Sequence, residues 1–138
     1  IAESELDFLE FKVDALKFAK DMEVDHEEAI LRVEVGSEVS KMTSKEIRRD
    51  LILMAERNPK LFLDLVQDDN IMLRNFGIKA CEEGVIELSQ DQRLFKWKTN
   101  GRKLFEVPMG EHPNSALAAW FKTDESMSVY QNIEKRLK

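Results

Sequence analysis

Cysteine and histidine are scarce in this chain of 138 residues, which holds one cysteine, Cys81, and two histidines, His26 and His112. A single cysteine excludes a disulfide within the chain and indicates a reducing compartment, so we expect a cytoplasmic protein. His26 stands among acids, but their spacing places them on different sides of a helical turn, and no second histidine is near. We therefore predict a solvated helix start there, with no metal and no cofactor.

Glycine and proline are also rare, with 5 and 3 residues, and no apolar run reaches the roughly 18 residues of a membrane span. There is no glycine-rich phosphate loop and no His–Cys or His–Ser pair at a catalytic spacing, so we predict that the chain is not an enzyme and has no small-molecule substrate. The first residue is Ile1, with no signal-peptide pattern, which we interpret as the start of a fragment of a longer protein.

Charged residues make up 35% of the sequence, and hydrophobic residues make up 43%. This composition favours an ordered, largely helical protein. The net charge of −6 comes from residues 1–50, which hold 14 acidic and 8 basic residues, whereas residues 51–138 hold 13 of each. A dedicated nucleic-acid binder usually has a basic excess, which this chain lacks as a whole.

Residues 3–22 show the clearest helical pattern in the chain, with two apolar stripes at spacings of three and four. One stripe comprises Leu6, Leu9, Val13 and Leu16, and the other comprises Phe8, Phe11, Ala15, Phe18 and Met22. The two stripes lie on nearly opposite sides of the helix, whereas a surface helix ordinarily buries one. One possibility is that this helix lies between its own domain and a partner, or the absent remainder of the chain, with Phe8, Phe11, Phe18 and Met22 as the partner-binding residues. The other is that the second and last helices bury both stripes.

Local signals predict the other helices. Asp25 is expected to cap a helix that begins at His26. Thr43 and Glu46 form a capping box for a helix over 44–57, and Pro59 starts the next, over 59–67. Further helices are expected over 70–83, where Asp68 and Asp69 suit the helix dipole, and in two segments of 113–138.

Three short strands are expected at 85–88, 94–98 and 104–107, the last two joined by a turn at Asn100-Gly101. The predicted fold class is α+β, mostly helical, with about six to seven helices and one antiparallel three-stranded β-meander. We expect an N-terminal helical segment over 1–42, a core over 43–107, and a C-terminal helical pair over 108–138.

The order of three helices and a β-ribbon, with the stretch LRNFGIKACEEGVIELSQDQRLFKW, resembles a winged helix. The resemblance implies that the helix over 70–83 would face DNA, with Arg74, Asn75 and Lys79 exposed to contact it. Asp68 and Asp69 at its start disfavour that use. The stretches NGRKLFEVP and SALAAWFKTDE also resemble uncharacterised proteins of tailed bacteriophages, which would imply an accessory or virion-associated protein in the host cytoplasm or virion.

The β-ribbon itself is basic and holds no acid between its first and last cation. Its cations are Arg93, Lys96, Lys98, Arg102 and Lys103. Phe95 and Trp97 alternate with the lysines, so we expect one apolar face on the helices and one basic face in water. That face either binds a nucleic-acid backbone or acidic partner, or solubilises an exposed strand and guards it against edge pairing.

Two functions follow. The favoured one is a non-enzymatic protein-interaction or assembly module that docks a protein partner or a second copy through the two-faced first helix. The alternative is a nucleic-acid-binding module that uses the basic hairpin, with Arg74 and Lys79.

Overall fold

The computed structural model describes residues 2–138, and side chains from Glu5 onward. Within that range the chain has seven α-helices and one three-stranded antiparallel sheet, which confirms the predicted α+β, mostly helical fold. It divides into two compact units, which we call unit 1 (up to Met72) and unit 2 (Leu73–Lys138). This division differs from the three segments expected from the sequence, because the helices over 44–57 and 59–66 pack on those over 2–21 and 24–35 in unit 1.

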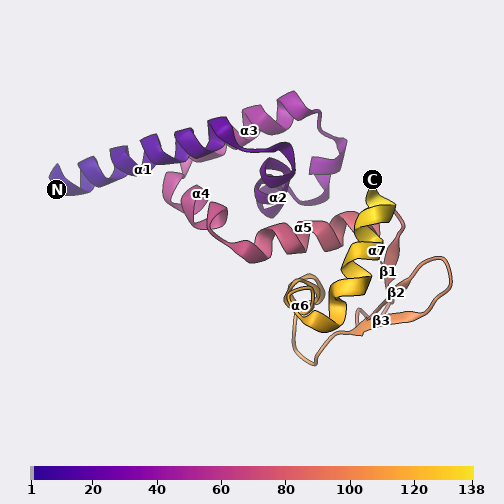
Figure 1. Ribbon diagram of the computed structural model, residues 1–138. Helices are drawn as coiled ribbons and strands as arrows, with labels where there is room; N and C mark the ends of the chain where they lie inside the picture. The colour runs from indigo at the N-terminus through magenta and orange to yellow at the C-terminus, as the bar shows by residue number, and fades with distance from the viewer. Residues whose placement is uncertain (1) are drawn as a thin grey trace. The chain divides into compact units, whose positions relative to one another are not determined.

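Unit 1 is helical (Figure 1). It comprises α1 (Ala2–Asp21), α2 (Val24–Val35), a 3₁₀ segment (Gly36–Lys41), α3 (Ser44–Arg57), α4 (Pro59–Val66) and the start of α5 (Asp69–Glu82). The Thr43–Glu46 capping box opens α3 as predicted, since Thr43 Oγ1 accepts a hydrogen bond from the Glu46 amide and Glu46 accepts one from the Thr43 amide. Pro59 occupies the first turn of α4, and Asp68 accepts a hydrogen bond from the Asn70 amide at the start of α5.

The predicted start of α2 is wrong. The helix begins at Val24, and the amide of Glu27 already donates a backbone hydrogen bond to the carbonyl of Glu23. Asp25 therefore lies inside the first turn instead of capping it, where its charge favours the helix dipole.

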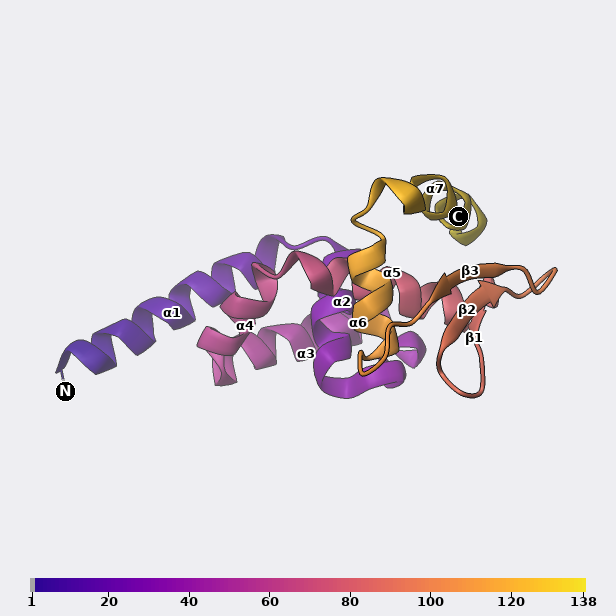
Figure 2. The same ribbon diagram turned by 90° about the horizontal axis from the view of Figure 1, so that it is seen from below.

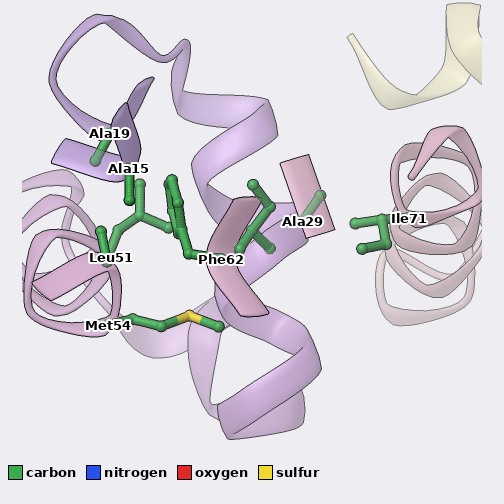
Figure 3. Close-up of a cluster of buried hydrophobic side chains, with 9 residues drawn as sticks. Ala15, Ala19, Ala29, Leu51, Met54, Phe62 and Ile71 are labelled. Carbon is green, nitrogen blue, oxygen red and sulfur yellow. The ribbon is translucent and has the colours of Figure 1, made fainter. Parts of the chain in front are cut away.

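The core of unit 1 joins small residues of two helices to large residues of others. Figure 3 shows Ala15 and Ala19 of α1, Ala29 of α2, Leu51 and Met54 of α3, Phe62 of α4, and Ile71 of α5. Ala15, Ala19, Leu51 and Phe62 are all completely buried. Alanines at the contact let α1 approach its neighbours closely, and Phe62 fills the space between them.

Unit 2 is built on the sheet. Its strands are β1 (Ile86–Leu88), β2 (Leu94–Trp97) and β3 (Lys103–Glu106). Each strand begins and ends within one residue of its predicted bounds. The sheet is followed by α6 (Pro113–Trp120), a 3₁₀ turn (Asp124–Ser126) and α7 (Met127–Leu137). The strand order is β1-β2-β3, with Leu88 opposite Phe95 and Phe95 opposite Phe105. Gly101 has a φ of 71°, which the predicted Asn-Gly turn requires.

Aromatic side chains dominate the core of unit 2. Phe76 stacks on Tyr130 with ring centroids 4.3 Å apart and meets the edge of Phe121 at 5.4 Å. Gly77 lies against α6, where an added Cβ would come within 2.8 Å of Leu117 Cδ2. The approach of α5 to α6 therefore depends on a residue without a side chain at position 77.

Candidate functional site

Helix α1 exposes six large apolar side chains. They are Leu6 (55% exposed), Phe8 (50%), Leu9 (56%), Phe11 (39%), Val13 (54%) and Phe18 (50%). Scattered apolar residues are normal on a protein surface, but contiguous apolar patches mark interaction sites. The six lie on one helix of 20 residues in two stripes of three, on nearly opposite sides of the helix.

The described side chains at the start of α1, from Glu5 to Phe11, are exposed because the helix extends beyond the rest of unit 1. In Figures 1 and 2 these turns reach past α3 and α4, which pack on the later turns. At about 100° per residue, Phe8 projects from the same side of α1 as the buried Ala15 and Ala19. The face that is buried near the core therefore continues outward as an exposed aromatic face.

The second stripe is exposed as well, except at Leu16, which packs against the core of unit 1. Leu6, Leu9 and Val13 are each more than half exposed on the opposite side of the helix. The alternative expectation, that both stripes are buried inside the protein, is therefore wrong for these residues.

A groove with a volume of about 610 Å³ lies at the C-terminal end of α1 within unit 1. It is lined by Asp14, Lys17, Phe18, Asp21, Met22, Glu23, His26, Val66 and Met72. Phe18, Met22, Val66 and Met72 give it an apolar surface, while three carboxylates and one ammonium group supply its charge. Of the predicted partner-binding residues, Phe8 and Phe11 lie on the projecting turns, and Phe18 and the half-buried Met22 line this groove.

The groove joins residues that the sequence pattern did not connect. Val66 ends α4 and Met72 lies in α5, far along the chain from Phe18. Met72 is 39% exposed, unlike the neighbouring Ile71, which is buried in the core. In the sequence, Ile71 and Met72 are simply two adjacent apolar residues. The sequence therefore carries no signal that Met72 is exposed and lines a groove.

A guanidinium group fixes the end of α1 to α3. Arg48 Nη2 donates a hydrogen bond of 2.6 Å to the backbone carbonyl of Lys20. Glu27 of α2 is 3% exposed, and its Oε2 atom accepts no hydrogen bond. Burial raises the pKa of the Glu27 carboxyl, and the positive charge of Arg48 partly opposes that rise.

The basic hairpin is arranged as its alternation predicts: Phe95 is completely buried and Trp97 packs at the edge of the same core. Two of its cations lie beside acids: Lys96 is 3.7 Å from Glu87 and Lys103 is 3.1 Å from Glu106. Lys98 and Arg102 are exposed and Arg93 is half-buried. From α7, Arg136 lies over the Trp97 ring at 4.5 Å, which adds a cation near the strand.

The cations of α5 are less accessible than the sequence suggests. Arg74 and Lys79 are half-buried, and the Nε atom of Arg74 is buried without a hydrogen-bond partner. Asn75, which was expected to be exposed, is 6% exposed. That expectation is wrong, because the Asn75 side chain is buried and cannot reach DNA.

Other chemistry is sparse in the part of the chain that the structure describes. Among these residues no three His, Cys, Asp or Glu side chains gather as metal ligands, and no helix is long and apolar enough to cross a membrane. Burial, and to a lesser extent the negative charge of Glu82, raise the pKa of the Cys81 thiol to about 11, so it is a weak nucleophile at neutral pH. His112 serves the fold, since its Nδ1 accepts a hydrogen bond from the Asn114 amide at the start of α6.

No protein-family model, curated protein or solved structure matches this chain.

Proposed function

We propose that this protein is an interaction module that docks a protein partner on α1, through Phe8, Phe11, Phe18 and Met22. We call these four residues the docking face. The observation that supports the proposal is the half-exposed state of Phe8, Phe11 and Phe18 on a helix that extends beyond its own core.

Burial of this face would supply substantial free energy. Covering a large apolar side chain is worth about 1.5–3 kcal/mol when it goes from fully exposed to fully buried, so each of these half-exposed rings has roughly half of that to gain. Three rings and Met22 then contribute a few kcal/mol, against which association costs at least about 4 kcal/mol of lost freedom. The docking face therefore supports a stable complex only with further contacts, which Leu6, Leu9 and Val13 offer on the other side of the helix.

Site-specific crosslinking tests this proposal. A photoreactive phenylalanine at position 8 or 11, in cells that make the protein, is expected to give one discrete crosslinked species. The same group at Lys122, an exposed position in unit 2, is the control. Absence of a crosslinked species at positions 8 and 11, or equal crosslinking at position 122, would contradict the proposal.

The hairpin supports a second candidate function, binding of a nucleic-acid backbone. The observation that favours it is the exposure of Lys98 and Arg102, together with Arg136 at the Trp97 ring. Fluorescence anisotropy with labelled single-stranded and duplex DNA tests it. Binding that weakens steeply with salt and is lost when Lys98 and Arg102 are changed to Glu would support this function, and binding unchanged by those reversals would exclude the hairpin.

A further inference from the structure

The docking face leads along α1 into the groove. At about 100° per residue, Phe11, Phe18 and Met22 project from α1 within roughly 40° of one another, so they form one line. The line is about 16 Å long, because eleven residues each rise about 1.5 Å. It begins on the exposed turns and ends in the groove between Phe18, Val66 and Met72.

Charge at this end of the line is predominantly negative. Asp14 and Asp21 of α1 and Glu23 after it line the groove and are exposed. Lys17 is the one ammonium group among the lining residues that the structure describes. The groove therefore presents an apolar surface beside a net excess of carboxylates.

We infer that the occupant of the docking face is a basic amphipathic helix of a partner protein, with apolar side chains on Phe11, Phe18 and Met22 and lysine or arginine side chains at Asp14, Asp21 and Glu23. This inference rests on the proposed function and adds the chemical class of the partner. An occupant that follows the line needs about three helical turns.

The other occupants fit the chemistry less well. An extended peptide adds to the open edge of a sheet, whereas the backbone groups of a helix are already paired within the helix. Nucleic acid and anionic lipid carry the same sign of charge as the groove and would be repelled. A helix in a groove needs only apolar contacts and flanking charges of opposite sign.

The test uses the full chain and two fluorescein-labelled model peptides of about 15 residues, long enough for partial helicity. Both carry leucines at spacings of three and four, with lysines flanking the leucines in one peptide and glutamates in the other. The methionine methyl groups are labelled with ¹³C, which gives six probes across the chain. Met22 and Met72 report the groove, and the exposed Met109 and Met127 of unit 2 are internal controls.

The lysine peptide is expected to shift the Met22 and Met72 resonances, with Met109 and Met127 unmoved, and to bind about tenfold more tightly than the glutamate peptide, as two or three exposed ion pairs allow. The double variant Asp14→Lys, Asp21→Lys changes only exposed positions, so it keeps the fold, and it is expected to reverse this preference.

Equal binding of the two peptides at Met22 and Met72, or an unchanged preference in the double variant, would overturn the basic character of the partner and leave the docking function standing. Failure of both peptides to shift Met22 and Met72 would overturn the inference altogether. The docking function itself is decided by crosslinking from positions 8 and 11, which requires no assumption about charge.

Discussion

The guanidinium of Arg48 and the carbonyl of Lys20 are joined by a hydrogen bond of 2.6 Å across 28 residues of sequence. The last carbonyls of a helix have no partner within it, and here α3 supplies one to the last turn of α1. The same guanidinium also provides positive charge for the buried Glu27 carboxyl. Arg48 therefore couples α3 to both α1 and α2.

Replacing Arg48 by Met removes this hydrogen bond and keeps most of the aliphatic stem. Because the group is exposed, we expect a loss of only about 1 kcal/mol in the free energy of unfolding, measured by urea denaturation with far-UV circular dichroism. Arg49→Met is the matched control, since the exposed Arg49 pairs with its sequence neighbour Asp50, and this change should cost less than about 0.5 kcal/mol. Equal effects of the two variants would contradict the coupling role of Arg48.

Glu27→Gln should change how stability depends on pH. Because burial raises the pKa of Glu27 above 4.5, the folded state holds this proton more tightly than the unfolded state does. The contribution of Glu27 to stability is therefore most favourable below pH 4.5 and declines as the pH rises through the raised pKa. We expect the melting temperature of Glu27→Gln, relative to the native protein, to increase as the pH rises from about 4 to 7.

The control for that experiment is Glu56→Gln, which removes one charge at an exposed position of α3. A relative melting temperature of Glu27→Gln that is constant or falls over this range would show that burial does not govern the Glu27 carboxyl.

Cys81 should be nearly unreactive in the folded protein. With a pKa of about 11, its thiolate fraction at pH 8 is roughly one hundredth of that of a thiol with the ordinary pKa of 9.0. We expect labelling by a chromogenic disulfide reagent to be about 100-fold slower in buffer than in concentrated urea. Rapid labelling in buffer would show that the thiol is more accessible than its place in the core of unit 2 allows.

Gly77→Ala should destabilise unit 2 although alanine favours helices. The added methyl group meets Leu117 Cδ2 at 2.8 Å, and Leu117 is 1% exposed and cannot move aside freely. Overpacking costs about 1–3 kcal/mol, which exceeds the roughly 1 kcal/mol gained from helix propensity. Both tryptophans, Trp97 and Trp120, lie in unit 2, so urea denaturation followed by tryptophan fluorescence reports on this unit.

A double-mutant cycle with Leu117→Ala isolates the contact between positions 77 and 117. In the Leu117→Ala background the methyl group has space, so Gly77→Ala should become neutral or stabilising. If Gly77→Ala lowers the free energy of unfolding equally in the native and Leu117→Ala backgrounds, the strain does not come from the contact with Leu117.

The parts of the fold that the sequence predicts correctly are those set by short-range motifs. The Thr43–Glu46 box and the Asn100–Gly101 turn each act within a few residues, so the elements they delimit appear where expected. Asp25 failed as a cap because Glu23 and Glu27 already start the helix two residues earlier. The periodicity at Asn75 did not reveal that this amide is buried.

The candidate site was predictable only in part. The spacing of Phe8, Phe11 and Phe18 reveals an apolar stripe, but whether the stripe is covered depends on where α3 and α4 end in space. The groove requires Val66 and Met72 beside Phe18, a contact among three elements that no single stretch of sequence encodes.

The attachment of α1 to its unit through Ala15 and Ala19 has a consequence for backbone dynamics. Among the described side chains of α1, those in the core of unit 1 begin at Ala15, and isolated helices of about 12 residues or fewer are marginal in water. Amide hydrogens of the first three turns should exchange with solvent after local fraying, while those near Ala19 should exchange only when unit 1 opens. The first turns of α1 thus form a segment that a bound partner would order, and slower exchange there would report binding directly.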